Sequence, residues 1–343
     1  MAGLLKKKET GVVAIIMLLC IPISLTSSSF LTLENLLNLA KSNIVLCILA
    51  MGMLPVMLTG GIDVSIAQIV ALVSVCVGKM MSHASDDFSV FLIFLIAIII
   101  GSVLGAVNGL VVSKGIPPIA VTLGTSSIMK GIINIWTNGM WINTMPNSFI
   151  EFGSIKLFPF TTESGVASGV SVQFLFLVAV IVLTAFFLKY TMVGRSIYAY
   201  GGNKISASRT GFNLNKTLMV VYTYAGLMAG VAAMIHVSIM RQIDPVTFNG
   251  FELNVVAVVV LGGVSVIGGS GSVIGTIFGV ILMSVVSNGL VLAHISTYWQ
   301  QVITGGILIL TVIYDAVSTR MKNEKVSRVD VEPLETDIIS EGM

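Results

Sequence analysis

The sequence predicts an all-α polytopic membrane protein with about ten transmembrane or half-membrane helices. Of its 343 residues, 55% are hydrophobic and only 10% are charged, and the mean hydropathy is +1.00. These charges are too few to cover the surface of a soluble globule of this size. Ten apolar runs divide the chain, and several approach the length of about 20 residues that a helix needs to cross the hydrocarbon.

The first two segments predict one span and one surface helix. The apolar run 11–25 follows three lysines and lacks a small-residue cleavage site, so we expect a retained span with its basic end inside; an uncleaved signal anchor has the same pattern. Residues 30–41 place leucines at helical spacing between polar residues, with Thr32 or Ser29 as a cap. We expect an amphipathic helix in the outer interface.

The other nine apolar runs occupy residues 43–59, 64–81, 90–113, 117–135, 170–188, 217–237, 254–267, 272–292 and 299–317. The run 254–267 is short, and a half-crossing buried within protein would fit it; full crossing by 117–135 is also left open. We expect one membrane domain over residues 1–318. The segment 319–343 lacks apolar spacing, and we expect it to be a disordered cytoplasmic tail.

The cations predict which ends face the cytoplasm. With ten crossings both termini lie on one side, and thirteen of the 18 Lys and Arg residues then lie inside against five outside. Loops rich in Lys and Arg stay on the cytoplasmic side of spans, so both termini are expected inside. Residues 189–216, which we term the central island, carry five of these cations and no carboxylate. We expect this segment to face the cytoplasm.

The central island also contains helix signals. Gly201 and Gly202 interrupt the chain, Asn203 or Ser206 can cap a helix of about two turns, and Gly211 can end it in a left-handed conformation. So short a helix is unstable alone and must lie against something. Two interpretations remain: a basic connector on anionic lipid, or a docking helix for a cytoplasmic partner.

Two polar breaks suggest where a solute crosses. Residues 58–65 place two glycines and a carboxylate between apolar runs, and an ionisable group there is a functional candidate. Asp63 is equally well placed to cap the helix that begins beside it, and the two roles can coexist. Pro117 and Pro118 start another helix with small and polar residues. Candidates for lining a translocation path are Asp63, Ser65, Asn108, Thr122 and Thr125.

Other patterns favour packing and turns over chemistry. Gly101, Gly105 and Gly109 recur every four residues, a spacing that lets helices approach closely. The glycine-rich stretch 261–272 lacks the Lys that a phosphate-binding loop needs, so it predicts a tight inner-face turn and no nucleotide site. It echoes the Gly60-Gly61 turn only weakly. Three scattered histidines and three cysteines without CxxC spacing predict neither a catalytic nor a metal site. His236 is expected to pack.

Four stretches resemble the permease subunits of bacterial ABC importers for monosaccharides, the ribose, xylose and galactose group. They are LTGGIDVSIAQIVAL at 58–72, NGLVVSKGIPPIAVTLGTSSIMKGI at 108–132, TMVGRSIYAYGGNKISASRTGFN at 191–213 and GFELNVVAVVVLGGVSVIGGSGSVIGTIFG at 250–279. The resemblance covers residues 30–318, with its motifs in the family's order. Residues 136–142 and 298–301 look most similar to the autoinducer-2 and rhamnose branch.

The resemblance implies a partner set and a role for the central island. Such a permease pairs with a second permease, as a homodimer or a heterodimer, with two cytoplasmic ATPases that bind the ATP, and with an extracytoplasmic sugar-binding protein. The island then becomes the segment that couples to the ATPase. Its expected coupling residues are Gly194, Arg195, Gly201, Gly202, Asn203, Ala207, Ser208, Arg209 and Gly211. Ser208 and Ala67 stand where the family usually has Ala and Gly.

The function expected from the sequence is therefore transport across the bacterial cytoplasmic (inner) membrane. The chain would translocate a pentose, a hexose or a related furanose such as autoinducer-2, with energy from a separate ATPase, and would need no cofactor or nucleic acid of its own. The alternative from another class is a secondary transporter that couples solute to protons or cations through Asp63.

Overall fold

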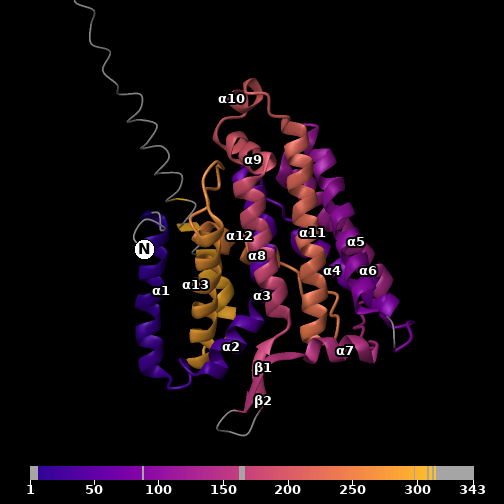
Figure 1. Cartoon of the computed structure of the whole chain (residues 1–343), viewed down its shortest axis with the longest axis vertical. Helices are drawn as coiled ribbons and strands as arrows, with labels where there is room; N and C mark the ends of the chain where they lie inside the picture. Colours follow the sequence, from indigo (N-terminus) through magenta and orange to yellow (C-terminus); the bar gives the residue numbers. More distant parts are fainter. Residues whose placement is uncertain are drawn as a thin grey trace, which may run out of the picture.

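The computed structural model describes residues 7–86, 89–161, 167–296, 298–306, 309–310 and 313, and most of them are helical (Figure 1). The tail predicted for 319–343 lies outside the described residues. The elements follow the chain in the order α1 (Lys7–Thr26), α2 (Leu33–Ser42), α3 (Ile44–Leu58), α4 (Ile66–Met81), α5 (Val90–Ser113), α6 (Pro118–Thr137), α7 (Asn147–Ser154), β1 (Lys156–Thr161), β2 (Ala167–Ser171), α8 (Gln173–Tyr190), α9 (Met192–Gly202), α10 (Lys204–Arg209), α11 (Leu214–Met240), α12 (Phe251–Leu261) and α13 (Val273–Leu292).

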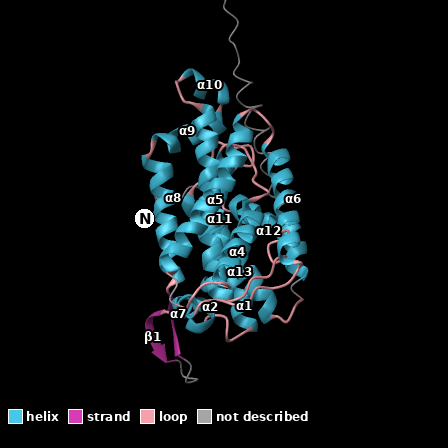
Figure 2. Cartoon of the chain, turned by 90° about the vertical axis from the view of Figure 1, so that its right-hand side faces the viewer, coloured by secondary structure: helices cyan, strands magenta, loops and turns pink. Residues whose placement is uncertain are grey.

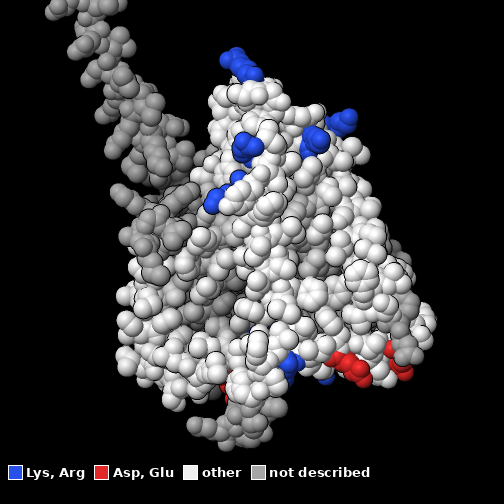
Figure 3. All heavy atoms as spheres, viewed as in Figure 1, with Lys and Arg blue, Asp and Glu red and all other residues white. Residues whose placement is uncertain are grey.

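The long helices run side by side, and the two ends of the bundle differ. Helices α9 and α10 cap one end, whereas α2, α7 and the β1–β2 hairpin lie at the other (Figures 1 and 2). Because α9 and α10 come from the cation-rich island, the positive-inside rule predicts that their end faces the cytoplasm. On this expectation we call it the cytoplasmic or inner end, and the opposite end the outer end. Figure 3 shows Lys and Arg side chains without visible Asp or Glu over the α9–α10 end, while at the opposite end the visible Asp and Glu side chains lie near further Lys and Arg side chains.

Five helices in the described chain are long and apolar enough to cross a membrane: α5, α6, α8, α11 and α13. A sixth span results if α2 and α3, which meet at 45°, are counted as one broken crossing. The apolar parts of α1, α4 and α12 are shorter. Nine of the ten predicted runs thus contain helices, and the tenth, 299–317, lies partly outside the described residues. The number of ten crossings stays a prediction.

The core lies around α3 and α11. Every residue of α3 is buried, which accounts for a helix that is apolar on all sides. Glycines bring α5 and α11 together: a Cβ added at Gly105 would overlap the Tyr222 carbonyl oxygen, and one at Gly101 would overlap the Gly226 carbonyl oxygen. The packing role predicted for these spaced glycines is confirmed.

The outer end adds one short β-hairpin to the predicted all-α fold. Antiparallel strands β1 and β2 pair Lys156 with Ser171 and Leu157 with Val170, and α7 precedes them. A hairpin pairs its own backbone groups, so a connector too short to span can fold at the membrane surface. The amphipathic helix expected at 30–41 is α2, and Thr32 caps it by accepting a hydrogen bond from the Asn35 N–H at 3.3 Å.

Candidate functional site

The central island folds into two short capped helices. Thr191 Oγ1 accepts a hydrogen bond from the Gly194 N–H at 3.0 Å and begins α9. Asn203 Oδ1 accepts one from the Ser206 N–H at 3.0 Å and begins α10, so Asn203 is the cap and Ser206 is its donor. Gly211 follows α10 with a φ of +87°, the left-handed conformation expected of it. The short helix predicted here therefore exists, with six residues.

Helix α10 lies at the end of the molecule (Figure 2), and most of its side chains are exposed. Ala207 is buried, whereas Ile205 is 65% exposed. The side chains around Ile205 are exposed and polar or cationic; we term this surface the docking tip, made of Lys204, Ile205, Ser208 and Arg209. An exposed apolar side chain among cations is suited to contact with a partner that carries acidic groups.

Helix α9 connects the docking tip to the bundle. Ser196 Oγ and Thr217 Oγ1 share a hydrogen bond of 2.5 Å, which ties α9 to α11. A Cβ at Gly194 would overlap the Leu188 carbonyl oxygen, so α9 lies tightly against the end of α8. Arg195 is exposed, and its Nη2 donates to Met192 Sδ at 2.9 Å. Of the family-matched residues, Gly194 thus anchors α9, while Arg195 faces solvent.

The last turn of α9 rests on two glycine-rich turns. A Cβ at Gly201 would overlap the Leu58 carbonyl oxygen, where α3 ends, and would also overlap the Gly269 amide nitrogen. The Gly269 N–H donates to that same Leu58 oxygen at 2.9 Å, and a Cβ at Gly60 would come within 2.7 Å of the Ile267 carbonyl oxygen. We term Gly60, Gly201, Gly268 and Gly269 the glycine junction. It brings the central island into backbone contact with the turns between α3 and α4 and between α12 and α13.

Tyr198 adds a side-chain contact to this junction. Its hydroxyl donates a hydrogen bond of 3.2 Å to the Gly271 carbonyl oxygen. Burial raises the pKa of Tyr198, so the hydroxyl keeps its proton at neutral pH. The sequence marked the three stretches separately and related 58–65 to 261–272 only weakly. Their meeting depends on helices distant in sequence, and no local pattern signals it.

The turn after the junction leads into a buried polar cluster. Asp63 Oδ1 accepts hydrogen bonds from the Ser65 N–H at 2.9 Å and from Ser65 Oγ at 2.6 Å. Asn108 Nδ2 donates to Ser65 Oγ at 2.7 Å. Asp63, Ser65 and Asn108 are at most 1% exposed. Asp63 thus holds the turn that leads into α4, whose N-cap residue is Ser65, and in this form it takes a part close to the capping role expected of it.

The cluster keeps unused polar atoms. Asp63 Oδ2, Asn108 Oδ1 and Tyr222 Oη are buried without a hydrogen-bond partner among the described residues. Thr122 Oγ1 accepts from the Val64 N–H at 3.1 Å and so joins α6 to the turn, whereas Thr125 bonds only to the Thr122 carbonyl oxygen of its own helix. Four of the five predicted path residues are thus brought together inside the subunit, and their lining of a path stays a prediction.

A polar cavity of about 460 Å³ lies at the start of α12, where sequence reasoning named no site. Its polar side chains are Thr247, Asn249, Asn254, Gln301 and Thr304. Gln68 Nε2 donates a hydrogen bond of 3.2 Å to Asn249 Oδ1 and so holds this lining side chain in place. His236 packs its ring edge-on against the ring of Phe248, with 4.7 Å between the two ring centroids. This is the packing role expected of His236. The sequence could have indicated this cavity through the amide and hydroxyl side chains at the start of the short apolar run 254–267.

The family described as "Branched-chain amino acid transport system / permease component" matches residues 35–312. The chain belongs to this family of ABC importer permeases. It is a transport subunit and not an enzyme, and it is a multi-pass protein of the inner membrane.

Relatives of the permease cover most of its length. It is 32% identical over 311 residues to the ribose import permease protein of Escherichia coli (strain K12), covering 90% of this chain and 93% of the relative. It is 32% identical over 317 residues to the autoinducer 2 import system permease protein of Enterobacter sp. (strain 638), covering 92% and 88%. A D-allose transport system permease protein of Escherichia coli (strain K12) is 29% identical over 298 residues, covering 87% and 88%. No solved structure matches the permease.

Proposed function

We propose that the permease imports a small sugar: a pentose, a hexose or a related furanose such as autoinducer-2. A separate ATPase that binds the docking tip supplies the energy. The curated relatives named for ribose, autoinducer 2 and allose support the substrate class. The single structural observation that carries the mechanism is the glycine junction. A partner that moves α10 must also move α9, and α9 contacts the turns of four membrane helices through backbone atoms.

Close backbone contact is suited to transmitting motion. Side chains at an interface can change rotamer and so absorb a small displacement. Two main chains that touch directly at glycines have no side chains that can adjust, so a displacement of one moves the other. ATP-driven closure of the partner would tilt α3 and α4 on one side of the junction and α12 and α13 on the other. Alternating access then follows from two packings of the same helices.

The polar cavity at the start of α12 supports a route for the solute. Its amide and hydroxyl side chains can donate to and accept from sugar hydroxyls, and weak, replaceable hydrogen bonds of this kind suit passage better than tight binding. In this proposal a second permease, the same chain or a homologue, closes the other side of the route. A sugar-binding protein delivers the sugar at the outer end.

The docking claim is tested by combining Arg209→Glu with Gly211→Val. The first change reverses a charge on the docking tip, and the second places a β-branched residue at a φ of +87°, which costs about 1–2 kcal/mol. We expect normal membrane insertion, loss of the co-purifying ATPase and no sugar uptake. Lys130→Gln on α6 is the control for loss of a cation elsewhere. Wild-type uptake by the double variant would overturn the docking claim.

The energy source is tested in vesicles that hold the whole transporter. Labelled ribose uptake should continue when the ion gradients are dissipated and ATP is maintained, and it should stop when ATP is removed. The opposite result would favour ion coupling through Asp63. Replacing ribose by leucine tests the substrate class, because the family description names branched-chain amino acids; uptake of leucine in preference to any sugar would refute the sugar proposal.

A further inference from the structure

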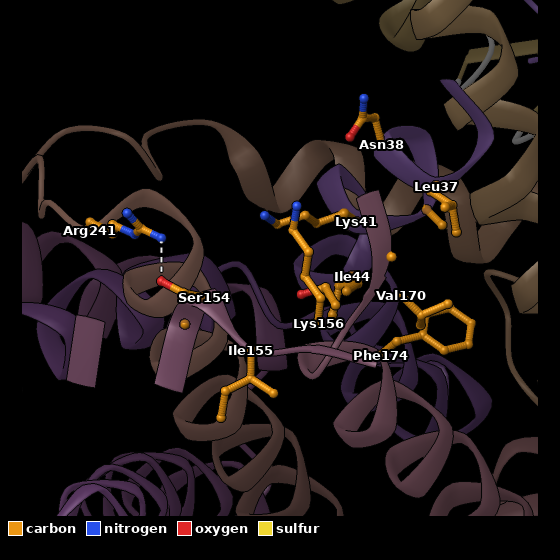
Figure 4. Close-up of a pocket in the computed structure, with 14 residues that line it drawn as sticks. Leu37, Asn38, Lys41, Ile44, Ser154, Ile155, Lys156, Val170, Phe174 and Arg241 are labelled. Carbon is orange, nitrogen blue, oxygen red and sulfur yellow. Dashed lines mark hydrogen bonds between the residues drawn. The ribbon is translucent and has the colours of Figure 1, made fainter. Parts of the chain in front are cut away.

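Asp63, Asn108 and Tyr222 form a polar cluster that is sealed from solvent. Asp63 and Tyr222 are 0% exposed, and Asn108 is 1% exposed. The cavity of about 420 Å³ at the outer end is the opposite case, because exposed residues such as Arg241 line it, and Figure 4 shows Arg241 bonded to Ser154. A group that satisfies the atoms of the sealed cluster must therefore be enclosed with them.

Asp63 is a buried acid with no cationic side chain beside it. The buried polar side chains of the described chain include no Lys or Arg. The Ser65 N–H and hydroxyl donate to Asp63 Oδ1, and the start of α4 adds the positive end of its dipole. That dipole amounts to about half an elementary charge, so it offsets only part of the carboxylate. The rest of the buried charge stays unfavourable until a counter-charge joins it.

The hydrogen bonds of Ser65 fix the direction of the Asn108 amide. An ionised carboxylate can only accept, so the Ser65 hydroxyl gives its one proton to Asp63 Oδ1 at 2.6 Å. Ser65 Oγ can then only accept from Asn108, which places the Asn108 Nδ2 group on it at 2.7 Å. Asn108 Oδ1 and Asp63 Oδ2 are left without a hydrogen-bond partner among the described residues. Two acceptor oxygens thus flank the same hydroxyl group.

Tyr222 brings a third oxygen to the same place. Its Cβ lies 3.2 Å from the position of a Cβ added at Gly109, the residue that follows Asn108. Its Oη lies 2.8 Å from the position of a Cβ added at Gly61, two residues before Asp63. The ring therefore runs from beside Asn108 to the turn that carries Asp63, and the missing side chain of Gly61 leaves space at the hydroxyl. Tyr222 Oη also has no hydrogen-bond partner in the part of the chain that the structure describes.

We propose that this cluster holds one monovalent metal cation, with Asp63 Oδ2, Asn108 Oδ1 and Tyr222 Oη as its protein ligands. Hard cations take oxygen ligands such as carboxylates and amide carbonyls. A single carboxylate balances a single positive charge, and the described residues contain no group of three His, Cys, Asp or Glu that could hold a metal ion. The site lies where α3 ends and α4 begins, and interrupted membrane helices offer Na⁺ sites of this kind.

A proton or a water molecule answers only part of this arrangement. A proton on Asp63 Oδ2 removes the charge, but it can bond to only one of the other two oxygens. A water molecule can donate to Asp63 Oδ2 and Asn108 Oδ1 and accept from Tyr222 Oη, yet it leaves the carboxylate charge in place. A small cation offsets the charge and contacts all three oxygens.

The ion is a resident of the fold and does not accompany the sugar. It joins α5, α11 and the turn between α3 and α4 at one point, and Gly60 of the glycine junction lies in the same turn. Its removal should therefore loosen the packing of the inner end. Because the effect is on stability, it can be measured without sugar uptake, whatever the outcome for the transported substrate.

The first experiment uses the complete wild-type transporter, so no variant has to fold. The transporter is purified in mild detergent and equilibrated at length, since the site is buried, in NaCl, KCl or choline chloride at one ionic strength. NaCl or KCl should raise the melting temperature of the permease by about 3 °C over choline chloride. Radioactive Na⁺, or Rb⁺ in place of K⁺, should be retained at one ion per permease chain. Equal melting temperatures in the three salts would overturn the proposal and leave a proton or a water molecule in the cluster.

Variants then assign the ion to this cluster. Asp63→Asn removes the charge and the need for the ion together, so the difference between the metal salts and choline chloride should vanish. Tyr222→Phe removes one ligand and should raise the half-maximal cation concentration about tenfold. The matched control is Tyr224→Phe on the same helix, whose hydroxyl shares a hydrogen bond of 2.6 Å with Thr184. It should lower the melting temperature in every salt and keep the cation effect. If the cation effect survives Asp63→Asn, or if the two Tyr variants weaken it equally, the ion binds elsewhere and the proposal is wrong.

Discussion

The two ends of the permease are built from different contacts. At the cytoplasmic end, Gly201 and Gly269 bring main chains of α9 and of two turns into direct contact, with a hydrogen bond of 2.9 Å between Gly269 and Leu58. At the outer end, side chains of α2, β1 and α8 surround cavities of about 420 and 300 Å³. In the proposed mechanism the close main-chain contact at the inner end transmits displacement, whereas the outer end packs through side chains that leave cavities between them.

The largest effect is expected at the glycine junction. Gly201→Ala should remove nearly all ATP-driven uptake, because its Cβ overlaps the Leu58 carbonyl oxygen, and overpacking of this kind costs about 1–3 kcal/mol. Uptake and ATP hydrolysis are measured on the same vesicles. The matched variant is Gly202→Ala, whose Cβ meets nothing within 4 Å and which should keep most uptake. If both variants lost the same share of ATP-driven uptake, the close contact at Gly201 would not be what transmits motion.

A variant of Gly153, at the outer end, tests whether tight glycine packing alone is enough to affect coupling to the ATPase. A Cβ at Gly153 would overlap the Ser238 carbonyl oxygen, so Gly153→Ala should lower the melting temperature through the same overpacking. We expect the ratio of sugar transported to ATP hydrolysed to stay at the wild-type value, since Gly153 is remote from the docking tip. A loss of that ratio as large as for Gly201→Ala would show that both ends transmit motion.

Asp63 is expected to give the next largest effect. Asp63→Asn keeps an acceptor for the Ser65 N–H and should retain most uptake, as Asn is a good cap. Asp63→Leu removes the acceptor for the buried Ser65 N–H and hydroxyl, although Asn108 still donates to Ser65 Oγ, and an unsatisfied buried donor costs about 1–3 kcal/mol. Uptake is compared at equal protein amounts in the membrane. If Asn fails as badly as Leu, the negative charge itself is required.

The smallest effect concerns the attachment of α2. Asn35 and Asn288 exchange two hydrogen bonds of 3.1 Å each, which tie α2 to α13 beside the hollow lined by Leu177 and Ile281. Replacing either by Ala should lower the free energy of unfolding by about 1 kcal/mol, with a non-additive double variant. Thermal unfolding of the four proteins measures this coupling. Additive losses would show that the pair does not hold α2 in place.

Much of the fold was predictable because its signals are local. Apolar run length marked the long helices, and the four-residue spacing of Gly101 and Gly105 marked a close helix contact, whose partner proved to be α11. The glycines and Asn203 of the island marked α10, whereas α9 was not predicted. Asn203 and Gly211 act as cap and terminator because such roles depend on neighbouring residues alone. The β1–β2 hairpin was missed, since a short segment with few alternating residues carries a weak strand signal.

Composition, charge distribution and spacing were sufficient to determine a membrane bundle with a cationic cytoplasmic segment, because burial in lipid and the positive-inside rule act on short stretches. Tertiary structure alone decided which glycines meet at the junction, where the polar cavity opens, and how Lys41, Lys156 and Arg241 come to line one cavity at the outer end. The reason is physical: these contacts join residues far apart in sequence, and they exist only once the helices have packed.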